Sequence, residues 1–231
     1  MMDQDALKQM AAAAAVAYVQ DGQVVGLGTG STFRYVIARL ADRVREGLRI
    51  SGVPTSRETA RLAREAGIPL LPDDGAWAVD IALDGADQVD PQLNLIKGGG
   101  GALLKEKIVA AAAARLVVIV DETKQVSVLG GPFPLPVEVV QFGWGTVARQ
   151  LEQFGCRVVP RMKDGVLFTT ESEHHILDLW FPAIEDPGRL EIALETTPGV
   201  VCAGLFVGRA DVVLVATQQG LITLNRRGAR P

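Results

Sequence analysis

The chain has 231 residues, 48% of them hydrophobic, and a net charge of −4 from 27 acidic and 23 basic side chains. This size and apolar content suit one large domain, or a large domain with a small second one. The acidic balance argues against nucleic acid as the main partner, and the two cysteines, Cys156 and Cys202, are too few for a disulfide framework. We therefore expect a cytoplasmic protein with reduced cysteines.

Strands and helices alternate along the first half of the chain. The apolar run 11–19 is too short to span a bilayer and follows acidic residues, so it predicts an alanine-rich helix that ends near Asp21–Gly22. Further helices are predicted from residue 32 to about 46, from a capping box at Thr55 to Gly67, and over 102–115. Buried strands are predicted at 24–28, 48–53, 68–71, 77–83 and 116–120. This order predicts an α/β fold: a Rossmann-like, mostly parallel sheet with helices on both faces.

The composition changes at residues 130–136, where the sequence GGPFPLP is dense in glycine and proline. We interpret this stretch as a domain boundary. The elements beyond it follow a β-α-β-β-α-β order, which predicts a smaller ferredoxin-like α+β domain. These elements are strands at 137–140, 156–160, 175–181 and 200–206 and helices at 144–154 and 187–196, with a further strand at 166–170 between the second and third of these strands. The predicted limits are 1–131 with 208–231 for the catalytic domain and 132–207 for the small domain, and a strand at 210–216 with a hairpin partner at 220–224 is expected to rejoin the first sheet.

Four polar loops lie outside the predicted strands, and three of them directly follow the end of a strand. They are Gly28–Thr32, Asp84–Asp87, Lys97–Gly101 and Asp121–Lys124. Ligands of open α/β sheets bind at the carboxyl ends of the strands. We therefore expect these loops to contribute to one crevice.

The first loop, Gly28-Thr29-Gly30-Ser31-Thr32, suits a phosphate group. Its glycines let the backbone approach a ligand, its hydroxyls can donate, and the following helix adds its N-terminal dipole. The alternative is a tight turn in which a serine or threonine only caps the helix. Lys124 is a second phosphate candidate, or else a solvated cation.

The second loop places two carboxylates three residues apart, in Asp84-Gly85-Ala86-Asp87. Such a pair can bind a metal ion or act as acid and base on hydroxyl groups, and it can also be a polar turn at the end of a strand. A metal is less favoured because no histidine or cysteine lies nearby in the sequence.

In the third loop, Lys97 is followed by four glycines, Gly98, Gly99, Gly100 and Gly101, which lead directly into a helix. This arrangement suits stabilisation of an oxyanion, although a Schiff-base lysine or a simple glycine hinge would fit the same residues. Glu106, in the first turns of that helix, is a candidate general base. Alone in a Lys-Glu-Lys run, it would be interpreted as a solvated helix charge.

Other polar residues carry weaker signals. His174 and His175 have no cysteine beside them, so we do not expect a metal site there. Arg157 and Arg161 are expected at the surface, unless the small domain contributes to the crevice.

Together and in this order, these loops resemble the ribose-5-phosphate isomerase A family. The resemblance covers nearly the whole chain. It is carried by GLGTGST (26–32), DGADQVD (84–90), KGGGGALLKEKIV (97–109), DETK (121–124), PLPVEV (134–139), PGVV (198–201), GLF (204–206) and ADVV (210–213).

The resemblance implies an enzyme that interconverts D-ribose 5-phosphate and D-ribulose 5-phosphate without metal or other cofactor, in the non-oxidative pentose phosphate pathway. Glu106 would be the general base that moves a proton between C1 and C2 through an enediolate. Lys97 and the amides of Gly98–Gly100 would hold the substrate and stabilise the oxyanion.

The remaining matches imply substrate contacts. Asp84 and Asp87 would contact sugar hydroxyls across Gly85 and Ala86, with Asp84 assisting ring opening. Residues 29–32 and Lys124 would contact the phosphate. The expected partner is thus a small sugar phosphate rather than nucleic acid or a membrane. The family implies a homo-oligomer, either a dimer or a tetramer.

Two other classes of function remain open from the sequence. An acyl-CoA transferase-like or amino-sugar phosphate deaminase-like enzyme would use a related fold, and the former would form a covalent thioester at Glu106. A sugar-phosphate sensor without enzymatic activity would normally carry a DNA-binding module, and no basic helix-turn-helix pattern is present.

Overall fold

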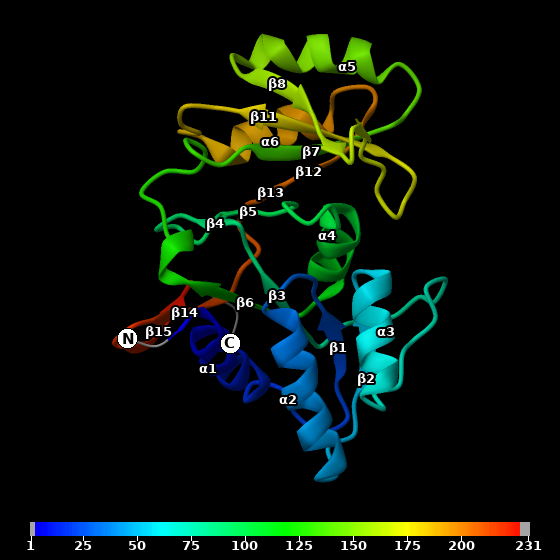
Figure 1. The fold of residues 1–231 in the computed structure, drawn as a ribbon, viewed down its shortest axis with the longest axis vertical. Helices are drawn as coiled ribbons and strands as arrows, with labels where there is room; N and C mark the ends of the chain where they lie inside the picture. Colours follow the sequence, from blue (N-terminus) through cyan, green and yellow to red (C-terminus); the bar gives the residue numbers. More distant parts are fainter. Residues whose placement is uncertain (1–2, 227–231) are drawn as a thin grey trace. The chain divides into compact units, whose positions relative to one another are not determined.

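The computed structural model describes residues 3–226, which divide into two compact units (Figure 1). Unit 1 combines three segments of the chain, 3–86, 105–124 and 209–226. Unit 2 combines two segments, 87–104 and 125–208. Each unit has its own sheet and core, and each is described by itself.

Unit 1 is built on a six-stranded sheet with the strand order β15-β14-β6-β3-β1-β2. Its strands are β1 (Val24–Leu27), β2 (Ser51–Pro54), β3 (Ile81–Gly85), β6 (Leu116–Asp121), β14 (Val212–Thr217) and β15 (Gly220–Asn225). Only the edge strand β15 is antiparallel to its neighbour. The predicted mostly parallel sheet is therefore confirmed, including the return of the last two strands to it.

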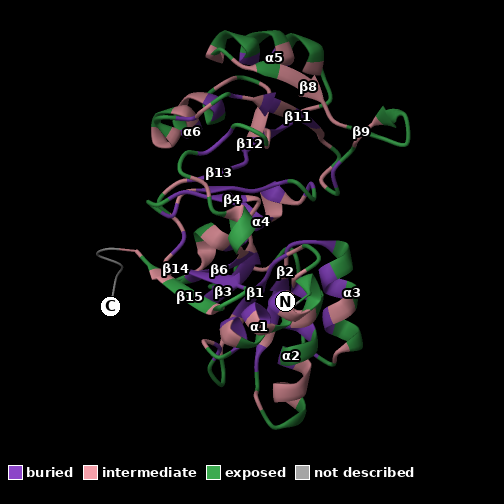
Figure 2. Ribbon diagram, turned by 60° about the vertical axis from the view of Figure 1, so that its left-hand side comes forward, coloured by how far each residue is buried: buried purple, intermediate pink, exposed green. Residues whose placement is uncertain are grey.

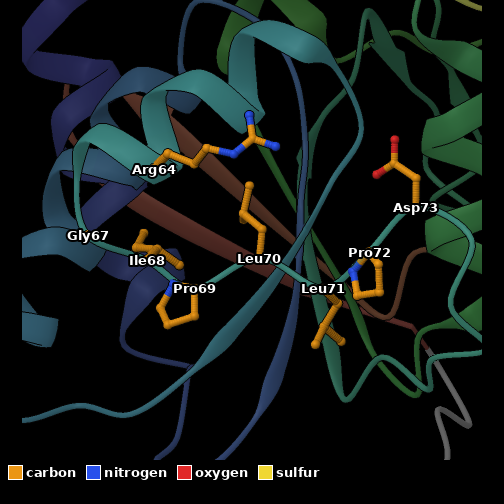
Figure 3. A pocket seen from close by; sticks show the side chains of 8 residues that line it. All are labelled: Arg64, Gly67, Ile68, Pro69, Leu70, Leu71, Pro72 and Asp73. Atoms are coloured by element: carbon orange, nitrogen blue, oxygen red, sulfur yellow. The ribbon is translucent and has the colours of Figure 1, made fainter.

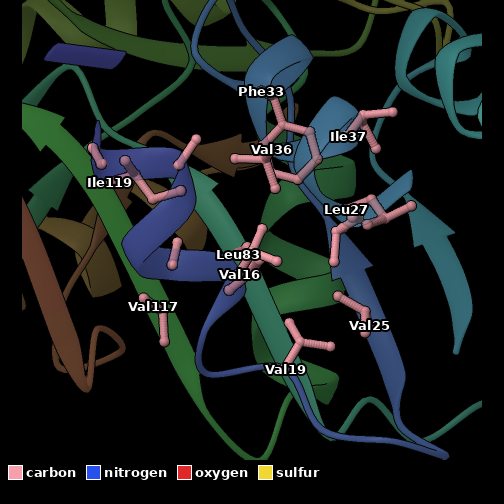
Figure 4. Packing of buried hydrophobic residues seen from close by; sticks show 14 of the residues in the cluster. Val16, Val19, Val25, Leu27, Phe33, Val36, Ile37, Leu83, Val117 and Ile119 are labelled. Atoms are coloured by element: carbon pink, nitrogen blue, oxygen red, sulfur yellow. The ribbon is translucent and has the colours of Figure 1, made fainter. Parts of the chain in front are cut away.

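Helices cover both faces of this sheet. They are α1 (Gln4–Val16), α2 (Phe33–Arg45), α3 (Arg57–Glu65) and α4 (Leu103–Ala112), followed by the short helix η1 (Glu122–Lys124). Alternate strand residues such as Leu27 and Leu83 pack under α1 and α2, as Figure 4 shows. On the other face, a Cβ on Gly26 would lie 2.5 Å from the Val109 side chain of α4, so helix and sheet approach closely there. The strand alternation places Asp84 on this second face.

Two helix ends differ from the sequence prediction. Helix α1 ends at Val16 rather than near Gly22, because the chain turns so that Val19 enters the core and Arg43 donates to the carbonyls of Val16 and Val19 at 2.8 and 2.9 Å. Helix α3 is capped by Ser56 rather than by Thr55, since the Ser56 hydroxyl accepts from the Thr59 N–H at 3.1 Å.

Unit 2 contains a four-stranded antiparallel sheet with the order β12-β7-β11-β8. This is the strand order 4-1-3-2 of a β-α-β-β-α-β unit, so the predicted ferredoxin-like architecture is confirmed. The elements are β7 (Leu135–Val139), α5 (Trp144–Leu151) with η2 (Glu152–Phe154), β8 (Arg157–Pro160), β11 (His175–Trp180), α6 (Pro187–Glu195) and β12 (Val200–Ala203). A hairpin of β9 (Met162–Lys163) and β10 (Val166–Leu167) extends from it.

Unit 2 also holds a three-stranded sheet that the sequence did not predict. It pairs β4 (Gln88–Val89), β5 (Leu95–Ile96) and β13 (Leu205–Phe206). The predicted single strand 200–206 is wrong, since the chain changes sheets at Gly204. There the Gly204 N–H donates to Pro136 O at 2.7 Å and a Cβ would lie 2.4 Å from Lys97 O, so only glycine fits.

The pairing of these short strands decides where residues 87–104 belong. They lie in unit 2, although the sequence reasoning grouped them with the catalytic domain 1–131 and 208–231. The predicted domain limits were drawn from composition and stay a prediction, and their last residues, 227–231, lie outside the described part of the chain.

Burial follows the layers of each unit. The strands are mostly buried and the outer faces of the helices exposed (Figure 2). Across residues 3–226, no helix combines the length and the apolar character that a membrane crossing needs.

Candidate active site

The predicted phosphate loop, Gly28–Thr32, joins β1 to α2 in unit 1. Gly30 has a φ of 116°, a conformation that favours glycine. Thr32 stands at the N-cap of α2, yet its side chain makes no capping hydrogen bond, so the interpretation of this threonine as a cap is wrong. Gly30 and Ser31 are exposed, which leaves the loop accessible to a ligand.

A cluster of hydroxyl groups, which the sequence reasoning missed, holds Thr29 in this loop. The Thr29 hydroxyl lies 2.8 Å from that of Thr55 and 3.5 Å from that of Thr59. Thr55 donates to Leu27 O at 3.0 Å and Thr59 to Gly28 O at 2.8 Å, and both threonines are buried. In the sequence, this cluster is marked by the TSRET run at the start of α3, a pattern that by itself predicts only a helix cap.

Asp84 lies in β3 rather than in a loop, and it is 4% exposed. Its Oδ1 accepts from the N–H of Gly85 at 2.8 Å and from that of Thr29 at 3.3 Å. A Cβ on Gly28 would lie 2.3 Å from the same oxygen, so the glycine makes the room that the carboxylate occupies. The structure therefore brings the first two predicted loops together at the ends of β1 and β3, with Ala86 two residues after Asp84.

Glu106 and Lys124 complete the predicted residues of unit 1. Glu106 lies in the first turn of α4 and is 6% exposed, so the interpretation as a solvated helix charge is wrong. Lys124 is half-buried in η1, directly after β6. The Asp121 carboxylate, at the end of β6, accepts from the Thr123 N–H at 2.9 Å and shapes this turn.

Lys97, Asp87 and the glycine loop Gly98–Gly101 belong to unit 2. Lys97 is 3% exposed, which excludes a surface lysine before a hinge, and its Nζ lies 5.6 Å from the centre of the Phe206 ring. The Lys97 N–H donates to Gly204 O at 2.8 Å, so the change of sheets at Gly204 also fixes the start of the loop.

Within this loop each glycine has a different environment. Gly98 and Gly101 have φ values of 104° and 82°. The Gly99 N–H donates to Asp87 Oδ2 at 2.8 Å, and a Cβ on Gly99 would lie 2.7 Å from Asp87 Oδ1. Gly100 is exposed, and a Cβ added to it would meet no atom within 4 Å. The turn therefore presents Gly100 to open space.

Arg161 contacts the same loop, although it was expected at the surface. Its Nη1 donates to Gly98 O at 2.7 Å and to Gly99 O at 3.1 Å, and the guanidinium also pairs with Asp178. Arg157, by contrast, is exposed and lies over the Trp180 ring at 5.1 Å.

Within the described residues, no group of three or more histidine, cysteine, aspartate or glutamate side chains could hold a metal ion. A surface hollow of about 550 Å³ lies beside the end of α3 (Figure 3). None of the predicted site residues lines it, and its walls come from residues 64 and 67–73.

Comparisons of the sequence with known proteins all point to one family. The model of the family "Ribose 5-phosphate isomerase A (phosphoriboisomerase A)" matches residues 51–220. The ribose-5-phosphate isomerase A of Gloeobacter violaceus is 52% identical over 99% of this chain and 100% of its own length. That of Thermococcus kodakarensis is 45% identical over 97% of this chain and 100% of its own length.

Solved structures agree with the sequence relatives. A D-ribose-5-phosphate isomerase in complex with phospho-erythronic acid superposes with a TM-score of 0.94 and 41% identity, covering 97% of this chain and 100% of its own. The ribose 5-phosphate isomerase A of Methanocaldococcus jannaschii superposes with a TM-score of 0.92 and 43% identity, covering 96% of this chain and 100% of its own.

Proposed function

The chain belongs to the ribose 5-phosphate isomerase A family, and from this premise we propose that it interconverts D-ribose 5-phosphate and D-ribulose 5-phosphate. The observation that carries the proposed chemistry is Glu106, a buried carboxylate in the first turn of the helix that follows the glycine loop. An isomerase of this kind needs one base that takes a proton from carbon and returns it to the neighbouring carbon.

In the proposed reaction, Glu106 removes the proton from C2 of the open-chain aldose and returns it to C1. The electron pair released from the C–H bond forms the enediolate, whose negative charge lies on oxygen, and the O2 hydroxyl proton passes to O1 as the C2 carbonyl of the ketose forms. Lys97 and the glycine loop Gly98–Gly100 stabilise that charge, with the Gly99 N–H holding the loop on Asp87 rather than contacting the substrate. Donors of this loop gain most in the transition state, where the charge develops. Their fixed geometry supports this role, because donors that need no rearrangement are the most effective.

The remaining residues bind and prepare the substrate. Asp84 assists ring opening by exchanging a proton with the sugar hydroxyls, and Asp87 contacts a further hydroxyl. Gly85 and Ala86, which lie between these two aspartates, belong to the same proposed substrate-binding stretch. Thr29, Gly30, Ser31 and Thr32 with Lys124 take the phosphate, for which the exposed loop at the start of α2 supplies N–H donors and a favourable dipole.

The alternatives left open by the sequence are not favoured, because the full-length relatives are named ribose-5-phosphate isomerase A. A hydroxylamine-sensitive adduct formed with acyl-CoA would favour a CoA transferase instead. We further propose a cytoplasmic homo-oligomer, dimer or tetramer, which light scattering after size exclusion would measure. Limited proteolysis near residues 131 and 208 would test the proposed domain limits.

The decisive experiment replaces Glu106 by glutamine in chelator-treated protein and follows ketose formation from ribose 5-phosphate. We expect kcat to fall by about 10²–10⁴-fold with KM nearly unchanged, because the amide keeps the shape of the side chain but cannot take a proton. Glu46→Gln, an exposed carboxylate of the same unit, is the matched control and should retain full activity. Near-full activity of Glu106→Gln would reject Glu106 as the base, and no ketose from the wild-type chain would reject the isomerase.

A further inference from the structure

We propose that Arg161 is a positioning residue that sets the peptide planes of the glycine loop and thereby directs the Gly100 N–H toward the enediolate oxygen. This inference rests on the proposed function, since it assigns a task within the oxyanion site. It adds a residue far from the loop in sequence, 63 positions from Gly98.

Arg161 is itself held firmly. It follows β8, and its N–H donates to Ile176 O at 2.9 Å. Its guanidinium binds the Asp178 carboxylate of β11 through two nitrogens, with Nε to Oδ2 at 2.9 Å and Nη2 to Oδ1 as the second contact. Both side chains are 15% exposed. A bidentate pair of this kind fixes the plane of the guanidinium, and so the direction of Nη1.

The remaining nitrogen, Nη1, reaches two successive carbonyls, those of Gly98 and Gly99. In a trans peptide the C=O and the following N–H point in opposite directions, and the described chain has no cis peptide. The N–H groups of Gly99 and Gly100 therefore both point away from Arg161. That of Gly99 is already used, because it donates to Asp87.

The Gly100 N–H is left for a ligand. Within residues 3–226 it donates to no protein acceptor, and Gly100 faces open space. The cation at the Gly99 carbonyl polarises the same peptide unit and makes its N–H a stronger donor. Asp178 balances the charge of Arg161, so the effect is one of orientation and polarisation rather than of net charge. Lysine could not replace Arg161, because one nitrogen cannot serve both the carboxylate and two carbonyls.

The test uses the double variant Arg161→Met/Asp178→Asn, which removes both members of the pair and leaves no unpaired buried charge. Arg157→Met, in the preceding strand β8 and exposed, is the matched control. Three quantities are measured on the purified chain: kcat and KM for ribose 5-phosphate, inhibition by inorganic phosphate, and inhibition by a four-carbon aldonate phosphate. The carboxylate of that aldonate imitates the charge and planarity of the enediolate.

We expect kcat to fall by about 10–100-fold in the double variant while KM changes by less than about threefold. The inhibition constant of the aldonate phosphate should rise by the factor by which kcat/KM falls, while that of inorganic phosphate stays within about twofold. Arg157→Met should match the wild type in all three. If the pair had a purely structural role, the inhibition constants of inorganic phosphate and of the aldonate phosphate would rise together.

Several results would overturn the inference. One is a folded double variant whose kcat and aldonate inhibition stay within about threefold of the wild type. Another is an equal loss for both inhibitors. If the double variant does not fold, the pair stabilises the fold, and the single variant Asp178→Asn provides the test. In Asp178→Asn the guanidinium is no longer held, so a retained kcat would likewise contradict the inference. Each of these results leaves an active wild-type enzyme, whereas failure of the proposed function would show as a wild-type chain that forms no ketose.

Discussion

Two glycine-containing loops, one in each unit, hold residues proposed to bind the substrate, and the two loops are held in different ways. In both, one N–H donates to an aspartate: Thr29 to Asp84 in unit 1 and Gly99 to Asp87 in unit 2. The rest of the first loop is fixed by neutral hydroxyls, whereas the second is fixed by the charged pair of Arg161 and Asp178.

The difference matches the charges that the loops are proposed to meet. A phosphate carries its charge throughout the reaction, so the first loop needs only fixed donors. Charge on the enediolate develops during the reaction, and a loop that stabilises it gains from polarised peptide units. Glycine supplies room for the backbone in both loops, while the neighbouring side chains decide how that backbone is directed.

The largest effect is expected where a glycine makes room for a catalytic group. In Gly28→Ala the new Cβ would lie 2.3 Å from Asp84 Oδ1 and 2.7 Å from Leu83 O. Displacing Asp84 should lower kcat/KM by about 10²–10⁴-fold, and the overlap should destabilise the fold by about 1–3 kcal/mol. Steady-state kinetics and urea unfolding measure both. Gly145→Ala, which meets no atom within 4 Å in α5, is the control. Wild-type kinetics for Gly28→Ala would show that this glycine is not what keeps Asp84 in place.

A second pair of variants separates strain from ligand access in the second loop. Gly101→Ala combines a φ of 82° with a Cβ that would lie 2.7 Å from the Phe168 ring, so we expect a loss of about 2–4 kcal/mol in unfolding free energy. Gly100→Ala should change that free energy by less than about 0.5 kcal/mol, because its Cβ points into open space. Urea unfolding distinguishes them, and equal losses would show that the loop is not held as described.

The hydroxyl cluster gives a smaller and more selective effect. Thr59→Val removes the donor to Gly28 O and leaves that carbonyl unsatisfied, which should cost about 1–2 kcal/mol and raise KM for ribose 5-phosphate several-fold. Thr59→Ser keeps the hydroxyl and should restore KM. If valine and serine give the same KM, the hydroxyls do not position the phosphate loop.

The smallest effect on the enzyme itself is expected from its two thiols. Both cysteines are free and lie in unit 2, so thiol labelling reports on the opening of that unit alone. Burial raises the pKa of Cys156 from 9.0 to about 11. At pH 8 its thiolate fraction, and hence its labelling rate, should be about 100-fold below that of an ordinary thiol. Labelling with iodoacetamide, followed by mass spectrometry, measures the rate, and a rate within a few-fold of free cysteine would contradict the shift.

The raised pKa of Cys156 also makes the free energy of unfolding depend on pH. The folded chain retains the Cys156 proton where the unfolded chain loses it, so this contribution is fully present below about pH 9 and is lost as the pH rises through about 11. Cys156→Ser should remove this part of the pH dependence. Loss of this pH dependence in Cys156→Ser would assign the alkaline weakening to unit 2.

The sequence predicted those parts of the fold whose signal is local. Apolar runs such as 116–120 and the order of elements identified both sheets, and the glycine runs identified both loops. The strands β4, β5 and β13 have two residues each, too few to show a periodicity, so the sheet whose strand β5 leads into Lys97 was not predicted. Arg161 and the hydroxyl cluster act across long separations in the chain, which a spacing argument does not detect.

Because unit 1 is assembled from three segments of the chain, its strands can pair only in a fixed order during synthesis on the ribosome. Strand β6 obtains its neighbour β14 only when residue 212 has been made, after every residue of unit 2. Until then the apolar β6 presents an open edge, which is the kind of surface that pairs with other chains. Nascent chains that stop between residues 125 and 211 are therefore those most exposed to aggregation, and they should depend most on chaperones.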